Sequence, residues 1–378
     1  MGRTRKKNHS WDSIPSADKD ICAKIDTDAI QHNLAFFTKQ AGTEIMPVLK
    51  ANAYGHGLVP IAQFLRKKGV RYLGVATLGE AILLRHHGDK GRILSWLYDI
   101  HGKEVHDALA MDLDMTLFDE THLPMLTRMI PKGRTVRITV FVDTGIHRAG
   151  IPYEHAEQLC HTIAADPRFE LVGLMSHLVC SEKKNNRVVH QQLRRFRALR
   201  DQLAHDGIHP PLIHIANSEA CLHYDVSDFT LSRVGSGLYG FCTSPHLRLA
   251  MSLTAPIIQL TSIEKGDGVG YNWNFIAPRA MRIAIVPIGY ADVLTRSHHV
   301  FLHGTKRKVL GKWNMDQIVI EARPTDRLGD TVFLFGNGQR GVPTIMDLAK
   351  EGKTTPLEIA SHLGYRIYRN YSTYSLSR

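Results

Sequence analysis

One lysine stands where an apolar run gives way to small, turn-forming residues. Residues 46–49 lead directly into Lys50 and residues 51–57 follow, which predicts a buried strand that ends in a loop. An ammonium group at the end of a buried strand is costly to desolvate, so it needs a partner, contact with solvent or a chemical use. The chemical use open to a lysine amine is to form an imine with a carbonyl group. Taken alone, a solvated strand end is the simpler interpretation.

Further charged and polar side chains directly follow other apolar runs of the chain: Arg148, His177, Asn217, Ser218 and Arg233. If the runs are parallel strands of a barrel, their carboxyl ends open at one face, where barrel enzymes carry their active sites. A lysine, two arginines and a histidine would then share one mouth.

A glycine-rich segment follows Arg233. Gly235, Ser236 and Gly237, together with Ser218, could place backbone N–H groups and a hydroxyl around a phosphate, because glycine lets the backbone approach an anion closely. Such a loop is often ordinary turn chemistry, but barrels frequently hold phosphate beyond their last strands. A phosphate beside an imine-forming lysine implies pyridoxal 5'-phosphate.

The elements that must position these residues alternate between strand and helix. Helical patterns such as 58–68, 154–165 and 190–205 separate most of the apolar runs. This alternation over about 230 residues favours a (β/α)8 barrel, and no GxGxxG follows the first strand to support a doubly wound sheet. The runs are 45–50, 70–77, 93–97, 115–118, 136–143, 171–176, 212–216 and 229–233, with a possible first one near 21–25.

The pattern changes near Ala250, where strand-like runs follow one another without intervening helices: 256–263, 281–287, 308–310, 318–322 and 332–335. Strand after strand indicates a mainly antiparallel β domain. We therefore expect a basic polar leader over residues 1–20, a barrel over residues 21–250 and a C-terminal β domain over residues 251–378.

Composition excludes several classes of protein. The chain has 378 residues, 43% hydrophobic and 22% charged, which is typical of a folded globular protein with about two domains. Its net charge of +11 would suit nucleic acid, but the basic residues are scattered and form no stripe with aromatic residues between them. We expect no nucleic-acid partner.

Cysteine usage and hydropathy bear on the compartment. The five cysteines lie far apart with no CxxC pair, which argues against a disulfide framework and against a cysteine zinc site; we expect no metal. No apolar run is long enough to cross a bilayer, and no apolar segment follows the basic leader. These features favour a cytoplasmic protein with no membrane partner.

The residues around Lys50 resemble the pyridoxal-lysine signature of alanine racemases, which are fold-type III pyridoxal enzymes. The run Val48-Leu49-Lys50-Ala51-Asn52-Ala53-Tyr54-Gly55-His56-Gly57 is highly specific. Seven further blocks match the family in order, from about residue 20 to the end: 143–148, 216–218, 233–240, 269–271, 287–292, 315–317 and 366–371. The resemblance implies a homodimer with shared active sites that interconverts L-alanine and D-alanine and supplies D-alanine for cell-wall peptidoglycan.

The resemblance also implies residue roles. Lys50 would hold the cofactor and act as one acid/base group, with Tyr271 as the other on the opposite face of the amino-acid substrate. Tyr271 would need cationic neighbours to lower its pKa, and His177 could be one. Arg233 would donate to the pyridine nitrogen and keep it unprotonated, which makes the ring a poorer electron sink and favours simple proton exchange. The other implied cofactor contacts are Tyr54, His177, Ser218, Gly235, Ser236 and Tyr371, and the implied substrate contacts are Arg148, Met315 and Asp316.

Two positions depart from the family pattern. Phe141 stands where the family often has a carbamylated lysine that orients the arginine, so another group, an anion or an acidic side chain, would have to position Arg148. Asn314 stands where alanine-specific members commonly have cysteine, and its polar amide could admit a larger or polar substrate. A serine or broad-specificity racemase is therefore an alternative.

Three further alternatives remain. A decarboxylase of the same fold should not need Tyr271 as a second base, and a non-catalytic pyridoxal-binding protein should be a barrel without the residues that follow Ala250. Residues 356–365 have the cadence of a DNA-binding helix-turn-helix, but the chain lacks a basic recognition stripe.

Overall fold

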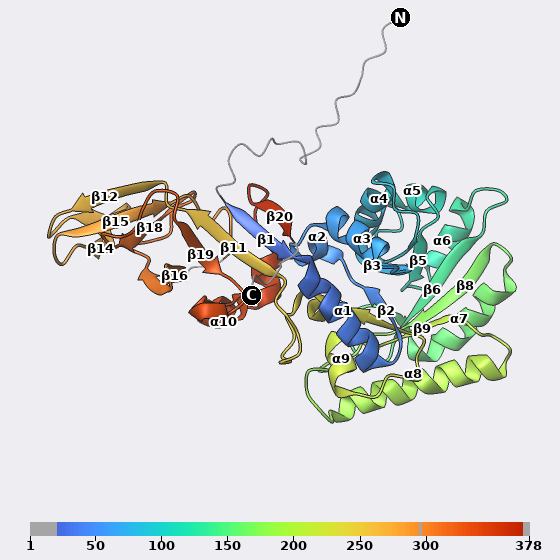
Figure 1. Ribbon diagram of the computed structural model, residues 1–378. Helices are drawn as coiled ribbons and strands as arrows, with labels where there is room; N and C mark the ends of the chain where they lie inside the picture. The colour runs from blue at the N-terminus through green and yellow to red at the C-terminus, as the bar shows by residue number, and fades with distance from the viewer. Residues whose placement is uncertain (1–20, 295–296, 373–378) are drawn as a thin grey trace, which may run out of the picture. The chain divides into compact units, whose positions relative to one another are not determined.

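The structure is a computed structural model that describes residues 21–294 and 297–372 (Figure 1). The predicted leader lies outside the described residues. The described chain forms two compact units. The barrel unit comprises residues 26–251 and 356–361, and the C-terminal unit comprises residues 21–25, 252–355 and 362–371.

Eight parallel strands form the barrel among the residues described: β2 (Glu44–Pro47), β3 (Tyr72–Thr77), β4 (Arg92–Leu97), β5 (Asp114–Leu117), β6 (Val136–Asp143), β8 (Phe169–Met175), β9 (Leu212–His214) and β10 (Leu231–Val234). The two-residue strand β7 (Ile151–Pro152) pairs in parallel with the end of β6. The strands from β3 to β9 form one continuous ladder, and β10 pairs in parallel with β2. A bridge from Val48 to Gly74 joins β2 to β3, and the Thr230 N–H donates to the Ile213 carbonyl to join β10 to β9. The predicted (β/α)8 barrel is confirmed.

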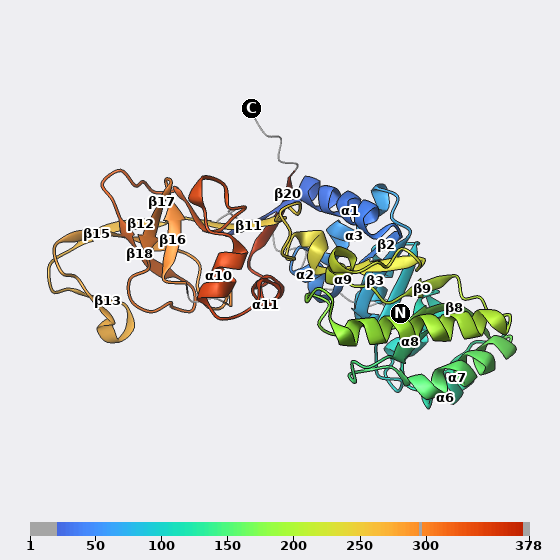
Figure 2. The same ribbon diagram turned by 90° about the horizontal axis from the view of Figure 1, so that it is seen from below.

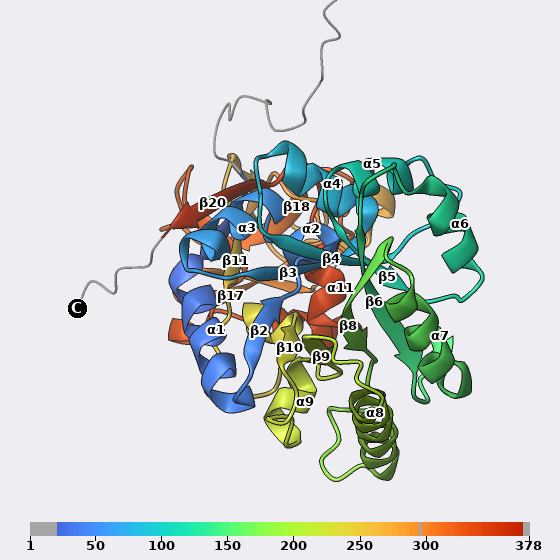
Figure 3. The same ribbon diagram turned by 90° about the vertical axis from the view of Figure 1, so that its right-hand side faces the viewer.

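Helices surround these strands, as Figure 3 shows. They are α1 (Thr27–Ala41), α3 (Leu58–Lys67), α4 (Leu78–His86), α5 (Glu104–Ala110), α6 (His122–Met129), α7 (Tyr153–Ala165), α8 (Arg187–His205) and α9 (Ser218–His223). Side chains cap the N-termini of several helices: Asp26 caps α1, and Thr77 with Glu80 forms a capping box on α4. Figure 2 shows α8 running along the outside of the barrel. Its apolar residues Val189, Leu193, Phe196, Leu199 and Leu203 are buried, whereas Arg187 and Arg194 are exposed.

Side chains from several strands fill the barrel interior. Met46, Leu94, Phe141, Met175 and Leu231 are all buried and pack together, one from each of five strands. Such a layer makes the barrel a packed core and leaves room for a ligand only beyond the carboxyl ends of the strands. Phe141, at the position where the resemblance implies a lysine, is part of this layer.

The C-terminal unit is mainly antiparallel, as predicted. A six-stranded sheet has the order β17-β16-β19-β11-β1-β20, and β12, β15 and β18 form a second, antiparallel sheet. The strands are β1 (Cys22–Asp26), β11 (Met251–Pro256), β12 (Gln259–Ile263), β15 (Met281–Val286), β16 (His299–Leu302), β17 (Thr305–Lys308), β18 (Ile318–Ala322), β19 (Thr331–Phe335) and β20 (Tyr368–Ser372). A short hairpin of β13 (Gly268–Val269) and β14 (Phe275–Ile276) and the helix α10 (Ile345–Glu351) complete it.

Two segments belong to a different unit from the one their sequence position suggests. The possible first barrel strand near 21–25 is β1, and it pairs with β11 and β20, so it is not a barrel strand. The helix α11 (Pro356–Ser361), which includes most of the helix-turn-helix-like stretch, clusters with the barrel unit. In the part of the chain that the structure describes, no helix is both long and apolar enough to span a membrane.

Candidate active site

Lys50 begins a strained turn at the carboxyl end of β2. The next four residues, 51–54, are not glycine, yet all have a left-handed backbone with φ between 51° and 56°. This conformation is unfavourable for L-residues by roughly 1–2 kcal/mol each, so other contacts must hold the turn. The Ala51 N–H donates to Glu80 Oε1 at 2.7 Å, and the Leu58 N–H donates to Asn52 Oδ1 at 2.7 Å.

Glycine is required at the end of this turn. Gly55 has φ +81°, and a Cβ added there would lie 1.8 Å from the Ala360 carbonyl oxygen of α11. Only a residue without a side chain lets α11 approach the turn this closely. The packing of α11 therefore helps to fix the segment that carries Lys50.

A cavity of about 220 Å³ opens at the carboxyl ends of the barrel strands. It brings together eight of the residues predicted to form the site: Lys50, Tyr54, Arg148, His177, Ser218, Arg233, Gly235 and Ser236. These residues come from five different loops or strand ends, so the cavity exists only because the barrel closes. Asn217 also lines it.

Arg233 is fixed by a full set of neighbours. It is only 5% exposed. One terminal nitrogen donates to His214 Nδ1 at 2.8 Å and to the His214 carbonyl at 2.9 Å, and the other donates to the Ser176 carbonyl at 2.6 Å and lies 3.3 Å from His177 Nδ1. No described residue accepts from its Nε–H. The guanidinium is thus held rigidly with one donor left for a ligand in the cavity.

Burial and nearby cations lower the pKa values of the two histidines beside Arg233. Burial, followed by the charges of Arg233, Arg148 and Lys50, lowers the pKa of His177 to about 3. Burial and then Arg233 lower the pKa of His214 well below its ordinary value. Because Arg233 donates to His214 Nδ1, the proton of that ring lies on Nε2. The role of His177 as a cationic neighbour for Tyr271 stays a prediction, and burial together with the cations around His177 disfavours a further positive charge there.

The loop after β10 lines the cavity and is held against Ser218 and Tyr54. The Ser218 hydroxyl oxygen accepts from the Gly235 N–H at 3.1 Å and from the Gly237 N–H at 3.2 Å. A Cβ on Gly235 would lie 2.4 Å from the Tyr54 hydroxyl, so glycine is needed for the loop to reach the ring. Tyr54 is buried, which raises its pKa and keeps its O–H as a donor, and no described residue accepts from that hydroxyl.

Both positively and negatively charged groups influence the Lys50 amine. Burial lowers the pKa of Lys50, Arg148 and Arg233 lower it further, and the carboxylate of Glu80 opposes them. A lowered pKa increases the neutral fraction of the amine, which is the form that attacks a carbonyl carbon. The cavity therefore suits Lys50 as a nucleophile.

Arg148 has no fixed partner. Its side chain is exposed and makes no hydrogen bond or ion pair with another residue in the described ranges. Phe141 lies in the cavity lining but cannot accept a hydrogen bond, so neither the family's lysine nor an acidic side chain orients the guanidinium here. Within the described chain, Arg148 is a free cation at the mouth.

The other four predicted site residues lie in the C-terminal unit and do not line this cavity: Tyr271, Met315, Asp316 and Tyr371. Tyr271, in the short helix η3 (Tyr271–Trp273), is 74% exposed and Met315 is 54% exposed. Asp316 accepts from Arg366 at 2.6 Å, and Tyr371 lies in β20. The role of each stays a prediction.

Sequence reasoning missed several residues that shape the site. Trp96 and Glu219 line the cavity, and Glu80 holds the Lys50 turn. Gln192, buried in α8, accepts from the Val179 N–H at 3.0 Å and donates to the His177 carbonyl at 2.9 Å. Trp96 directly precedes the end of a predicted strand, which was a usable signal. Helix residues such as Gln192 carry no comparable signal.

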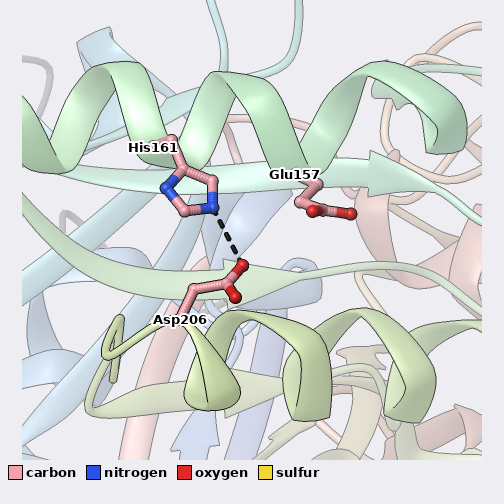
Figure 4. A group of neighbouring side chains, drawn as sticks. All are labelled: Glu157, His161 and Asp206. Carbon is pink, nitrogen blue, oxygen red and sulfur yellow. Dashed lines mark hydrogen bonds and ion pairs between the residues drawn. The ribbon is translucent and has the colours of Figure 1, made fainter.

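Charged side chains also gather away from the cavity. Figure 4 shows Glu157 and His161 one turn apart on α7, with Asp206 just past the end of α8. His161 Nε2 lies 3.0 Å from Asp206 Oδ2, and this bond accounts for the cluster without a metal. Within the described ranges, one other group has metal-ligand spacing: His303, Asp326 and Asp330. The expectation that no metal is needed stays a prediction.

Several polar groups of the cavity fit pyridoxal 5'-phosphate. The cofactor has a ring nitrogen that accepts a hydrogen bond, a phosphate and an aldehyde, and the cavity offers the Arg233 Nε–H, the Ser218 and Tyr54 hydroxyls, and the Lys50 amine. Barrel and cavity together define a pyridoxal-phosphate-binding protein of the (β/α)8 class.

Comparison with known proteins narrows this class. Residues 25–243 match the model "Alanine racemase, N-terminal domain" and residues 250–371 match "Alanine racemase, C-terminal domain". The alanine racemase of Mycolicibacterium smegmatis is 34% identical over 364 residues, which cover 92% of this chain and 93% of that protein. The structure of alanine racemase from Streptomyces lavendulae has a TM-score of 0.87 at 32% identity, covering 94% of this chain and 98% of that one. The chain belongs to the alanine racemase family, whose members are pyridoxal-phosphate-dependent isomerases.

Proposed function

We propose that this chain is a pyridoxal-phosphate-dependent amino-acid racemase that interconverts L-alanine and D-alanine by a two-base mechanism. The observation that carries the proposal is the setting of Arg233. Its four terminal N–H groups are occupied and no described residue accepts from its Nε–H, in the same cavity as Lys50. A fixed cation that can only donate keeps the pyridine nitrogen unprotonated, which suits proton exchange better than transamination.

Different residues of the barrel would bind the cofactor, move the proton and bind the substrate. Ser218, Gly235, Ser236 and Tyr54 would hold the phosphate, and Arg233 the ring nitrogen. When bound, the cofactor supplies an electron-withdrawing ring that acidifies the α-proton of the attached amino acid. The Lys50 amine would remove or return that proton on one face. Arg148, at the mouth, would pair with the substrate carboxylate, and that anion would then orient it in the absence of the family's lysine.

The residue proposed as the second base, Tyr271, belongs to the C-terminal unit. Tyr271 would deliver or remove the proton on the opposite face, and Met315 with Asp316 would line the substrate entrance. We propose that a homodimer completes each site with Tyr271 and Met315 of a second copy. Support comes from the exposure of these two side chains, 74% and 54%, and of Trp273, 66%, in the same short helix as Tyr271, because large side chains exposed together commonly mark an interface. Tyr371 would add a phosphate contact.

One observation favours a broader substrate range as the second candidate. The Oδ1 atom of Asn314, which directly precedes Met315, is buried without a hydrogen-bond partner among the described residues. Asn314 stands where alanine-specific members commonly have cysteine and directly precedes Met315, a predicted substrate contact, so a hydroxyl-bearing substrate is the alternative to test. Serine is therefore the amino acid to compare with alanine.

The biological role follows from the family. D-alanine made by this enzyme would supply cell-wall peptidoglycan, and the reaction would take place in the cytoplasm. All five cysteines are free, in agreement with a reducing compartment.

A chiral assay tests the proposal. Purified protein with added cofactor is incubated with the L-form of alanine, serine, lysine or arginine, and the D-form is quantified. We expect D-alanine to form fastest, with D-serine next, and Lys50→Ala to abolish both. Carbon dioxide release without inversion would instead indicate a decarboxylase, and wild-type rates in Lys50→Ala would refute the assignment.

A further inference from the structure

Glu80 joins the Lys50 turn to the start of a neighbouring helix. One carboxylate oxygen accepts from the Ala51 N–H at 2.7 Å. The other accepts from the Ala76 N–H at 2.9 Å and from the Thr77 N–H at 3.2 Å. Glu80 is the third residue of α4, and its own N–H donates to the Thr77 hydroxyl at 3.2 Å. A single half-buried carboxylate therefore ties together segments that follow β2 and β3.

The Lys50 turn needs such a tie. Four consecutive left-handed residues are unfavourable relative to an ordinary loop, so other contacts must hold them. Hydrogen bonds to a charged acceptor are stronger than those to a neutral one. The bond from Ala51 acts at the first residue of the turn, directly after the lysine, so it holds the backbone from which the Lys50 side chain leaves.

The charge of Glu80 acts on the same lysine. The ionisable groups that face the Lys50 amine are Arg148 and Arg233, which disfavour its cation, and Glu80, which favours it. His177 also lines the cavity but is neutral, and Tyr54 and Glu219 complete the ionisable lining. Glu80 is thus the carboxylate that offsets the two arginines.

We propose that Glu80 is a positioning residue for Lys50: its carboxylate fixes the left-handed turn and sets the balance of charge around the amine. The proposal rests on the proposed function for the use that Lys50 makes of this amine. A capping box alone would stabilise α4 and leave the reactivity of Lys50 unchanged. The two roles are therefore separable.

Acylation of Lys50 measures the amine directly. The full-length chain, freed of cofactor, is treated with acetic anhydride between pH 6 and 10, and the Lys50 peptide is quantified by mass spectrometry. Only the neutral amine reacts. Loss of the nearby negative charge in Glu80→Gln should move the midpoint of reactivity to lower pH. Acylation at pH 7 should become at least about twofold faster, because the neutral fraction rises tenfold when the midpoint falls by one pH unit. If only the access of acetic anhydride to Lys50 changed, the acylation rate would change by the same factor at every pH.

Two further variants complete the test. Glu170→Gln removes an exposed carboxylate at the amino end of β8 and should leave the midpoint unchanged. Glu80→Asp keeps the charge but shortens the reach, so it should retain the midpoint and accelerate hydrogen exchange at the Ala51 amide more than tenfold. Glu80→Asp also tests the proposal if the Glu80→Gln variant does not fold.

An unchanged midpoint in Glu80→Gln, or an unchanged Ala51 exchange rate in Glu80→Asp, would overturn the proposal. Failure of the proposed function looks different. In that case pyridoxal phosphate would not protect Lys50 of the wild-type chain from acylation, and no amino acid would be racemised, whatever Glu80 does.

Discussion

Replacement of His177 by asparagine should change how the stability of the barrel depends on pH. His177 has an ordinary pKa of 6.5 when unfolded and about 3 when folded, so the unfolded chain alone takes up a proton between these values. The wild-type stability is complete above pH 6.5 and is lost as the pH falls toward 3. The slope is about 1.4 kcal/mol per pH unit, which amounts to about 2 kcal/mol between pH 7 and pH 5. Asparagine keeps an acceptor near Arg233 and does not titrate.

Urea unfolding of the full-length chain measures this difference, with hydrogen exchange in the β8 peptide as a probe of the barrel unit. The free energy of unfolding of the wild type, minus that of His177→Asn, should fall by about 2 kcal/mol from pH 7 to pH 5. His214 is present in both proteins and cancels. Parallel pH curves for His177→Asn and wild type would refute a buried neutral His177.

Three other changes test the site. Gln192→Met, of similar size, removes the hydrogen-bond donor to the His177 carbonyl. We expect the protein to lose about 2–3 kcal/mol of stability and kcat to fall by a larger factor than KM rises. An unchanged kcat would contradict the role of this contact. Gly55→Ala forces a Cβ to 1.8 Å from the Ala360 carbonyl oxygen, so denaturant unfolding should show a loss of more than about 3 kcal/mol, and a loss below about 1 kcal/mol would contradict the observed packing. Tyr271→Phe should leave the cofactor's visible absorbance intact and reduce racemisation at least about 100-fold, as expected for loss of an acid/base group; symmetrical mild losses from both enantiomers would argue against two bases.

Sequence patterns were sufficient for the residues that follow strands. Lys50, His177 and Arg233 stand at the ends of apolar runs, and parallel strands in a barrel bring such ends to one face. The pairing of β1 was not predictable in this way, because its partners β11 and β20 lie far along the chain, beyond the whole barrel. The sequence of a short strand does not by itself indicate which sheet the strand joins.

Features that depend on burial or backbone strain also escaped prediction. The residues of the Lys50 turn are alanine, asparagine and tyrosine, which do not signal four left-handed residues in succession. The low pKa of His177 depends on burial and on three nearby cations, which the sequence around His177 does not indicate. Glu80 and Gln192 lie on helices and reach loops 29 and 15 residues away, so their roles appear only when the barrel is closed.

The most direct test of the central role of Lys50 is to locate the cofactor on the chain. The protein is incubated with pyridoxal 5'-phosphate, reduced with borohydride, digested and analysed by mass spectrometry, while a parallel sample is assayed for D-alanine. We predict a single reduced pyridoxyl group on Lys50 and loss of racemase activity on reduction. Labelling of another lysine, or full racemase activity in a sample whose Lys50 is labelled, would contradict that role.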